Sequence, residues 1–456
     1  MGTGGIQSDA AISDEAKLID SSYLGFIDPV HTPEGKRSGI SGHLSLGVRK
    51  KGTTPYIRVY DVKAGGHADK SPADLTLGNV AFSDQYHFPP GKKPIPKSES
   101  TVVIPSGGGD PSRIPTSDVD YVLQSPKQMF SITANLDPFL PSDQANRAGM
   151  ATRHIEQTIS LSNPEKPLVQ VVSGNDDPNY STWEKIVGRF TSHPSPVSGS
   201  VESVSASKIV VTDRSGKKHD VQLYDNFPLN DKKAFITSKP LVKKGDKVSN
   251  GQIIADTNFT EGGTLALGTN LRVGYLPYKG LVFEDGIVIS ESASKKLSST
   301  HLHKERSYVD KSMVVGLKKF RANYPGVVSE ENASKMDADG VVKKGQVVDP
   351  GEVLVTVLQK SEPSKEQILL RGIHKSLVKP FKNKSLMWDK PYRGVVTDVV
   401  RNGREVLVYV KTEEDADIGD KLSGRHGNKG VITAVVPDEE MPKDKDGNAL
   451  NIVLSP

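Results

Sequence analysis

Val242-Lys-Lys-Gly-Asp-Lys-Val-Ser-Asn-Gly-Gln-Ile-Ile254 is matched further along the chain by Val342-Lys-Lys-Gly-Gln-Val-Val-Asp-Pro-Gly-Glu-Val-Leu354. Both copies follow the pattern V-K-K-G-x-x-V-x-x-G-x-x-aliphatic. Because glycine permits the positive φ at which a chain reverses, each copy predicts short strands separated by glycine turns. Two copies indicate two related β-modules of the barrel-sandwich type. Ordinary hairpin punctuation is the alternative, and the pattern alone leaves it open.

Composition sets the outer limits of what the chain can be. Its 456 residues are enough for two to four domains, and 42 Gly and 30 Pro favour short strands and turns over long helices. The absence of cysteine excludes disulfides, thiolate zinc sites and cysteine nucleophiles. No apolar run approaches the roughly 20 residues that span a bilayer, so no membrane association is expected. The formal net charge of +4 is only weakly suggestive of a nucleic-acid partner.

Local patterns predict mostly strands. A short helix is expected over Asn146–Thr158, and the Pro-, Ser- and Gly-rich residues 86–118 are expected to form a loop. The predicted strands are His43–Val48, Tyr56–Val62, Lys208–Thr212, Gln252–Asp256, Leu271–Leu276 and Gly286–Ser290.

The densest chemical signal is Gly419-Asp-Lys-Leu-Ser-Gly-Arg-His-Gly-Asn-Lys-Gly430. Its glycines let the backbone approach a polyanion closely, and Lys421 and Lys429 could face phosphates from one side of a loop. The order of residues is not that of a P-loop, G-x-x-x-x-G-K-[ST]. A solvated basic turn is the plainer interpretation of such a stretch taken alone.

A second signal is acidic. Phe283-Glu-Asp-Gly286 places Glu284 and Asp285 just before a predicted strand. Paired carboxylates can hold Mg²⁺ directly or through water, because this hard cation prefers oxygen ligands. Glu-Asp before Gly is more often simply a turn.

Two further groups are unremarkable alone. Asn146-Arg147-Ala-Gly-Met150 begins a predicted helix, where Arg147 could grip a triphosphate through two hydrogen bonds. His31-Thr-Pro-Glu-Gly-Lys-Arg37 is a turn from which Glu34 and the two basic side chains project.

Taken together and in order, these groups resemble the β subunit of multisubunit DNA-dependent RNA polymerases. His31–Gly35 resembles the [HE]-T-P-E-G segment of that family, and Gly419–Gly430 is nearly identical to its G-D-K-x-x-G-R-H-G-N-K-G. The other matching segments are Pro138–Leu140, Gln144–Ala148, Pro167–Val169, Leu265–Val273, Phe283–Asp285, Met441–Pro442 and Asn451–Leu454. The resemblance extends from about residue 23 to Pro456.

The resemblance implies a mainly β fold with some α: a double-psi β-barrel core, barrel-sandwich hybrid modules and a reduced flap insertion. The domains expected from it are a flexible lead-in at 1–25; a fork- and external-β-like region at 26–130; the first part of the double-psi barrel at 131–305, with a barrel-sandwich hybrid insertion at about 170–260; a reduced flap-like domain at 306–410; and the second part of the barrel at 411–456.

The resemblance also implies roles for residues at the matched positions. Lys421 and Lys429 are expected to contact the RNA 3′ end and the incoming nucleotide, and Arg147 the triphosphate. Glu284 and Asp285 are expected to lie near the second Mg²⁺, which arrives with the nucleotide. They are expected to bind metal indirectly, or to bind this second ion only. Residues expected to contact RNA or DNA are Gln157, Arg425, His426, Asn428, Arg153 and Glu34.

The catalytic Mg²⁺ itself is expected on a partner, because the family's N-A-D-F-D-G-D motif is missing from this sequence. The expected partners are β′-type chains, chains supplying the remaining N- and C-terminal parts of β, a phage promoter-specificity subunit, and template DNA, RNA and nucleoside triphosphates. The alternative to separate β chains is that this sequence is a fragment of a longer product. The pattern is similar to the split β subunits of large tailed phages, which implies the cytoplasm of a bacterial host or the virion as the location. The alternative function is a non-catalytic scaffold that keeps only the fold.

Two departures from the bacterial pattern lead to local expectations. Arg401-Asn-Gly-Arg404 lies between alternating segments, which predicts a hairpin and a flap without its tip helix. Glu156 stands where the bacterial family has Arg, and Arg153 is expected to offset its charge through an i,i+3 pair.

Overall fold

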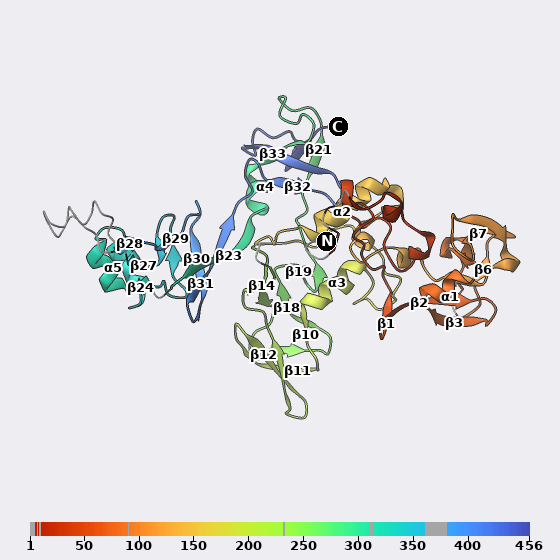
Figure 1. Ribbon diagram of the computed structural model, residues 1–456, viewed down its shortest axis with the longest axis horizontal. Coiled ribbons are helices and arrows are strands. Elements are labelled where there is room, and N and C mark those ends of the chain that lie inside the picture. Colours follow the sequence, from red (N-terminus) through yellow and green to blue (C-terminus); the bar gives the residue numbers. More distant parts are fainter. Residues whose placement is uncertain are drawn as a thin grey trace. The chain divides into compact units, whose positions relative to one another are not determined.

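A computed structural model describes residues 5, 6, 8, 11–89, 91–230, 233–310, 313–360 and 381–456 (Figure 1). Strands predominate among these residues, so the prediction of a mainly β fold with some α is confirmed. The chain divides into two compact units. The first comprises Met1–Thr158, Val169–Glu184 and Lys421–Val431, and the second comprises Ile159–Leu168, Lys185–Asp420 and Ile432–Pro456.

A seven-stranded sheet forms the base of the first unit. Its order is β1-β2-β9-β4-β7-β8, and β3 also pairs with β2. The strands are β1 (Arg49–Lys51), β2 (Thr54–Asp61), β3 (Gly66–Lys70), β4 (Val80–Ala81), β7 (Ser100–Ile104), β8 (Ser112–Pro115) and β9 (Tyr121–Leu123), with a separate pair of β5 (Tyr86–His87) and β6 (Ile95–Pro96).

This sheet is covered on both faces, as the period of two along its strands requires. Val59 packs in one hydrophobic cluster, whereas the next residue, Tyr60, packs in another. Val122 and Leu123 are likewise divided between the two clusters. The central strands β2 and β9 thus contribute apolar side chains to both faces of the sheet.

Two local predictions in this unit are wrong. Residues 86–118 are not a loop, because β7 and β8 pair over four residues within the sheet. His43–Val48 is not a strand: Leu44 makes one isolated bridge to Ile27, and Gly47 turns the chain at φ +87° before β1 begins.

The helices of the first unit are short. Helix α2 (Ala145–Glu156) buries only small residues, among them Ala148, Gly149 and Ala151, so it can pack closely. It agrees with the predicted helix Asn146–Thr158 to within two residues at each end. The others are α1 (Pro72–Thr76) and the 3₁₀ turns η2 (Glu15–Lys17), η3 (Ser21–Tyr23), η4 (Gly35–Arg37), η5 (Ser83–Gln85), η6 (Thr116–Asp118), η7 (Pro126–Met129), η8 (Ala134–Leu136) and η9 (Leu140–Ser142).

The second unit consists of several small sheets. Its strands are β10 (His193–Pro194), β11 (Gly199–Val204), β12 (Lys208–Asp213), β13 (Lys218–Gln222), β14 (Phe227–Pro228), β15 (Phe235–Ile236), β16 (Ser238–Pro240), β17 (Lys247–Val248), β18 (Ile253–Thr257), β19 (Thr260–Glu261), β20 (Thr264–Leu265), β21 (Val273–Tyr275), β22 (Gly286–Ser290), β23 (Ser299–Tyr308), β24 (Met313–Val315), β25 (Val347–Val348), β26 (Val353–Val355), β27 (Val357–Lys360), β28 (Phe381–Asn383), β29 (Leu386–Met387), β30 (Gly394–Asn402), β31 (Glu405–Glu414) and β34 (Ile452–Leu454). Helices α4 (Glu291–Lys296), α5 (Leu317–Asn323) and α6 (Glu330–Ser334) belong here, and α3 (Trp183–Thr191) begins in the first unit.

One sheet of the second unit has the order β21-β34-β22-β33, with β21 and β34 parallel. Strand β33 (Lys429–Val436) starts in the first unit, where it pairs with β32 (Lys421–Ser423). The predicted strands Lys208–Thr212, Gln252–Asp256 and Gly286–Ser290 are present as β12, β18 and β22. Leu271–Leu276 is shorter than predicted, as β21. The double-psi topology remains a prediction.

The two copies of the repeat make equivalent backbone contacts. In the first, Gly245 turns at φ +95° and its N–H donates to the Val201 carbonyl, while Val201 N–H donates to the Asp246 carbonyl, both at 2.8 Å. In the second, Gly345 turns at φ +84° and its N–H donates to the Val396 carbonyl at 2.7 Å. Val396 N–H donates back to the residue after this glycine, as Val201 does.

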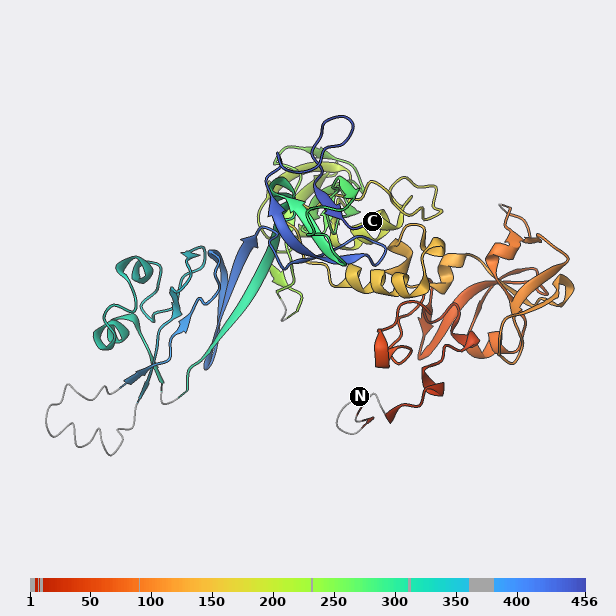
Figure 2. The same cartoon turned by 90° about the horizontal axis from the view of Figure 1, so that it is seen from above.

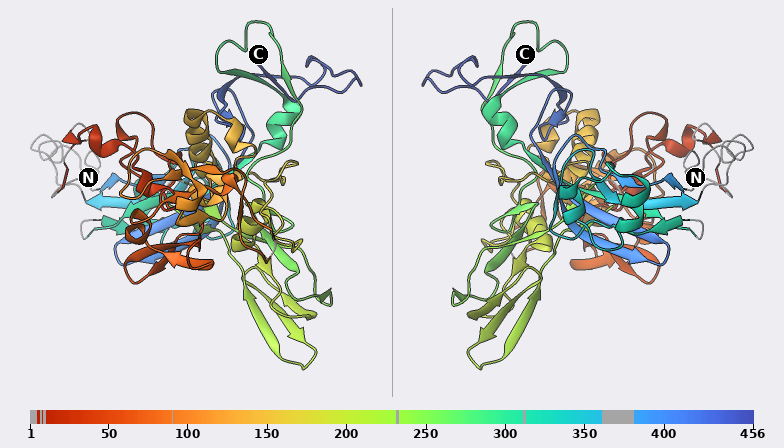
Figure 3. Two further views of the ribbon diagram at one scale, coloured as in Figure 1. Left: turned by 90° about the vertical axis from the view of Figure 1, so that its right-hand side faces the viewer. Right: turned by 90° about the vertical axis from the view of Figure 1, so that its left-hand side faces the viewer.

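The partner hairpins also correspond. Gly199 of β11 lies opposite Val248, and Gly394 of β30 lies opposite Val348. Both hairpins, β11–β12 and β30–β31, carry a register shift two residues beyond that glycine. Figure 3 shows the yellow-green strands of the first module as an antiparallel layer. The repeat therefore marks two related modules rather than common punctuation.

The order of parts differs between the two modules. The β11–β12 hairpin precedes its glycine repeat in the chain, whereas β30–β31 follows its own. Since the same contacts form in both, the modules are related by a permutation of chain order. The barrel-sandwich assignment of the two modules remains a prediction.

A long ribbon runs through the second module. Strand β23 pairs with β31 over ten residue pairs, and β31 pairs with β30 (Figures 1 and 2). The predicted hairpin is confirmed, but its two turn residues, between Asn402 and Glu405, are Gly403 and Arg404 rather than the predicted Asn402 and Gly403. The expected absence of a flap tip helix concerns a region that includes residues 361–380, which lie outside the described residues.

Candidate functional site

The basic glycine motif forms a hairpin in the first unit. We call residues 421–430 the glycine hairpin. Its two strands pair Lys421 with Val431 and Ser423 with Lys429. Residues directly opposite one another in an antiparallel pair, and residues two apart on one strand, share a face. Lys421 and Lys429 therefore project from the same face of the hairpin, as neighbours on the diagonal.

Both lysines are exposed. Neither makes an ion pair within the part of the chain that the structure describes. The ring of His154 lies on the same face, with Nδ1 2.8 Å from Ser423 Oγ. Burial lowers the pKa of His154, and the positive charge of Lys429 lowers it further. This face of the hairpin is therefore cationic and open.

Helix α2 supports the hairpin through Gly427. The glycine has φ +73°, and a Cβ added to it would lie 2.4 Å from the Arg147 carbonyl oxygen. Arg147 Nη1 in turn donates to the Gly427 carbonyl at 3.1 Å. Only glycine fits at position 427, because any side chain there would collide with the Arg147 carbonyl. The Arg147 side chain remains exposed beside the hairpin.

Arg425 and His426 are engaged inside the unit. Arg425 Nη1 donates to the Val169 carbonyl at 2.8 Å and lies 3.7 Å from the buried carboxylate of Glu184. Burial lowers the pKa of Arg425, against the opposing effect of Glu184. His426 Nδ1 lies 2.8 Å from Asp143 Oδ2. These two motif side chains anchor the hairpin, whereas Asn428 is exposed.

The acidic pair belongs to the second unit. Glu284 and Asp285 are exposed, on the turn that leads into β22, where Gly286 N–H donates to the Phe283 carbonyl at 3.0 Å. Glu284 adopts the left-handed conformation at φ +53°, which is uncommon for a residue other than glycine. Strained backbone of this kind is concentrated at functional sites. Two exposed carboxylates, without an ion pair among the described residues, are a donor set that suits Mg²⁺.

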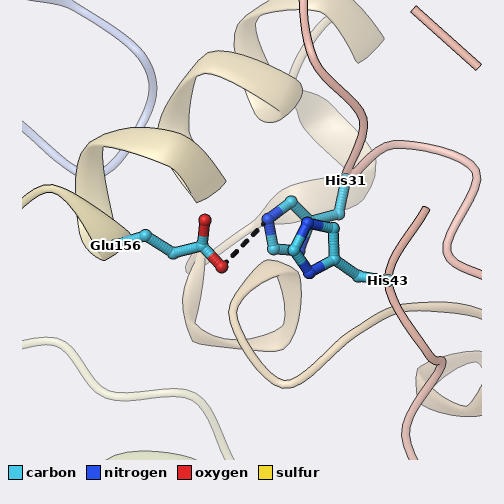
Figure 4. A group of neighbouring side chains, drawn as sticks. All are labelled: His31, His43 and Glu156. Atoms are coloured by element: carbon cyan, nitrogen blue, oxygen red, sulfur yellow. Dashed lines mark ion pairs between the residues drawn. The ribbon is translucent and has the colours of Figure 1, made fainter. Parts of the chain in front are cut away.

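The remaining predicted contact residues lie in the first unit. Gln157 is exposed at the C-cap of α2, Arg153 lies on its last turn, and Glu34 is the exposed N-cap of η4. The expected pair between Arg153 and Glu156 is not the one that forms. Glu156 Oε1 instead lies 3.2 Å from His31 Nε2 (Figure 4). The helical spacing that suggested the pair is outcompeted by this long-range contact.

The structure contains a stack of two imidazoles that the sequence did not predict. The His31 and His43 rings are parallel within 2°, with centroids 3.5 Å apart (Figure 4). His31 is buried, its Nδ1 lies 3.0 Å from Ser131 Oγ, and burial lowers its pKa while Glu156 opposes the shift. Nitrogen lone pairs lie in the ring planes, so two stacked rings cannot direct them at one ion. The group is therefore a poor metal site.

Asp137 and Asp143 are the other residues missed, since nothing in Pro138–Leu140 and its flanks predicts contact with a motif far along the chain. No helix among the described residues is long and apolar enough to cross a membrane.

Comparisons with known proteins identify the family. Residues 195–456 match the family model for RNA polymerase Rpb2, domain 6, and residues 1–49 that for RNA polymerase Rpb2, domain 3. The chain is 33% identical over 485 residues to the DNA-directed RNA polymerase subunit beta of Rubrobacter xylanophilus, covering all of this chain and 41% of that protein. It is 32% identical over 479 residues to the subunit of the same name from Prochlorococcus marinus (strain MIT 9301), covering all of this chain and 42% of that protein.

The chain thus spans about two-fifths of the length of these relatives. The match includes the glycine hairpin, the acidic turn and α2. On this evidence the chain belongs to the family of DNA-directed RNA polymerase β subunits.

Proposed function

We propose that this chain supplies active-centre residues of a multisubunit DNA-directed RNA polymerase, in complex with a β′-type subunit. The observation that carries the proposal is the glycine hairpin. It presents Lys421 and Lys429 on one face, free of ion pairs among the described residues, while Arg425 and His426 are used for anchoring. A surface built in this way favours binding of phosphates.

In the proposed mechanism the two lysines hold the phosphates of the RNA 3′ end and the incoming nucleotide. Arg147, beside the hairpin, binds the triphosphate. Phosphoryl transfer depends mostly on positioning and on cationic charge at the phosphates, so these residues act without covalent chemistry. Gln157, Arg153, Asn428 and Glu34 are proposed to contact nucleic acid, with Arg425 and His426 acting there mainly through the hairpin they anchor.

Glu284 and Asp285 are proposed to hold the Mg²⁺ that accompanies the nucleotide, directly or through water. When bound, this ion neutralises charge on the triphosphate. The ion at the reaction centre is proposed to be held by the β′-type partner.

The proposal extends to the assembly. The proposed partners besides the β′-type subunit are other β-type chains of the kind found in split phage subunits, a phage promoter-specificity subunit, DNA, RNA and nucleoside triphosphates. The proposed location is the host cytoplasm or the virion. Purification of the native assembly from infected cells and from virions, followed by subunit identification, tests these points together.

The test of function is RNA extension by the assembled polymerase. Lys421→Ala and Lys429→Ala are each expected to slow extension at least tenfold, since each removes a cation from a phosphate. The matched control is Lys97→Ala, which removes an exposed lysine of the same unit. If both hairpin variants extend RNA as fast as the control, the alternative of a non-catalytic scaffold is favoured instead.

A further inference from the structure

His426 lies between two carboxylates of the first unit. Its Nδ1 is 2.8 Å from Asp143 Oδ2 and 3.0 Å from Asp137 Oδ1. Asp137 follows η8 and Asp143 follows η9, as the C-cap residue in each case. Between them Phe139 takes the left-handed conformation at φ +64°, which reverses the chain. Both carboxylates thereby meet one imidazole ring.

Burial of the Asp137 carboxylate is energetically unfavourable. Asp137 is 2% exposed, and neither of its carboxylate oxygens has a hydrogen bond of normal angle within the described part of the chain. A buried carboxylate without full hydrogen bonding destabilises a fold, and an apolar residue of similar size would not. The basic groups that face it are His426 and Arg425.

The charges around this group are few. Burial raises the pKa of Asp137 to about 7, which His426 and Arg425 oppose and Asp143 reinforces. Glu184 faces Arg425 from the other side. Asp137 is thus the buried member of this group, and its partners Asp143 and His426 are partly exposed.

His426 links this group to the part of the hairpin that contacts α2 and carries Lys429. The ring is next to Gly427, whose backbone touches Arg147, and it precedes Lys429 by three residues. A hairpin released at His426 would lose the contact that keeps Gly427 on α2. The lysine would then lose its fixed position.

We propose that Asp137 and Asp143 are positioning residues that bind the His426 imidazole and so hold the glycine hairpin on α2. Holding the hairpin there places Lys429 for phosphate binding. The role of Lys429 rests on the proposed function. The docking does not, because it is a property of the first unit itself.

The docking is tested on the full chain by hydrogen exchange of the amides of residues 425–429. Asp137→Asn keeps the shape of the side chain but replaces a carboxyl oxygen by an amide nitrogen, and Asp143→Asn does the same at the second carboxylate that faces His426 Nδ1. Each is expected to accelerate exchange in the hairpin at least tenfold, with the amides of β9 unchanged. The control is Asp110→Asn, an exposed carboxylate of the same unit. Exchange within twofold of the wild type in both variants would overturn the proposal.

Two further arms keep the result decisive. If Asp137→Asn also exposes β9, the unit has unfolded, and His426→Gln is used instead, with the same acceleration expected. A group of two carboxylates and one imidazole could also hold a divalent ion. If EDTA accelerates exchange in the wild type as much as the substitutions do, and Mn²⁺ reverses this effect, the hairpin is held by a metal and the proposal fails.

The consequence for catalysis is measured in the assembled polymerase. Asp137→Asn is expected to raise the KM for nucleotides at least fivefold with a smaller change in kcat, because a displaced Lys429 weakens nucleotide binding. An unchanged KM together with accelerated exchange would leave docking intact but refute the placement of Lys429. Normal extension by Lys429→Ala would instead refute the proposed function while the docking result stands.

Discussion

The placement of the glycine hairpin on α2 depends on Gly427 having no side chain. A methyl group here meets the Arg147 carbonyl at 2.4 Å, a backbone atom of a helix that cannot give way easily. The positive φ adds its own strain. The proposed position of the hairpin lysines thus depends on the absence of a Cβ at Gly427.

Gly427→Ala is therefore expected to destabilise the first unit by about 3 kcal/mol, from backbone strain and a clash that forces the hairpin off α2. Urea unfolding of the full chain measures the change. Gly47→Ala is the matched control, because Gly47 has φ +87° but open space around it, and only about 1 kcal/mol is expected there. Equal effects at the two glycines would show that the contact with Arg147 contributes nothing.

Asp137 gives a prediction for pH. Its folded-state pKa of about 7 lies above its ordinary value of 3.8, so the folded unit binds a proton that the unfolded chain releases. The stability linked to this carboxyl is fully present below about pH 4 and is lost as pH rises through 7. The free energy of unfolding of the wild type should therefore fall between pH 5 and pH 8 relative to Asp137→Asn. A constant difference between the two proteins over this range would contradict the assignment.

At the scale of elements, the two repeated modules share their critical glycines. A Cβ on Gly199 would lie 2.1 Å from the Thr212 carbonyl oxygen, and one on Gly394 would lie 2.3 Å from Val410 Cγ1. Equivalent positions thus meet different neighbours, one of them backbone and the other a side chain. A side chain can change its rotamer, whereas a paired strand cannot move without losing its hydrogen bonds.

Gly199→Ala is accordingly expected to destabilise its module by about 3 kcal/mol and Gly394→Ala by about 1–2 kcal/mol. The urea midpoints of the two variants measure this difference. Gly268→Ala serves as the control, because no atom lies within 4 Å of its Cβ position and its φ is not positive. The equivalence of the modules would be in doubt if neither glycine were more sensitive than Gly268.

The same elements show what sequence could predict. The β12 and β22 strands are continuous β-branched runs with clear ends, and both were predictable. Strand β7 was not predicted, although Thr101–Ile104 is also β-branched, because the surrounding Gly and Pro residues suggested a loop. The glycine repeat indicated related modules, but the permuted chain order depends on pairing with a distant hairpin, which no local pattern reveals.

The candidate site divides in the same way. Lys421, Lys429 and Arg147 were predicted from motifs that resemble the family. The grip on His426 was not predictable, because it brings Asp137 and Asp143 to a segment more than half the chain away. Likewise the contact between Glu156 and His31 replaces a helical pair that local spacing favoured. Long-range polar contacts are set by tertiary packing, which single motifs do not encode.

At the scale of the whole molecule, the two units contribute different chemistry. The first carries the cationic hairpin and Arg147, and the second carries the acidic turn at Glu284 and Asp285. Chain connectivity joins the two units within β33, whose first residue is Lys429. The proposed function assigns phosphate binding to the first unit and metal binding to the second.

The most direct measurement of the central claim is chemical trapping of the RNA 3′ end in the assembled polymerase. Periodate oxidation of the terminal ribose gives a dialdehyde that forms an imine with a lysine within reach, and borohydride fixes the bond for peptide mapping. We expect label on Lys421 or Lys429 and none on Lys97. Label confined to other lysines of this chain, or to other subunits alone, would contradict it.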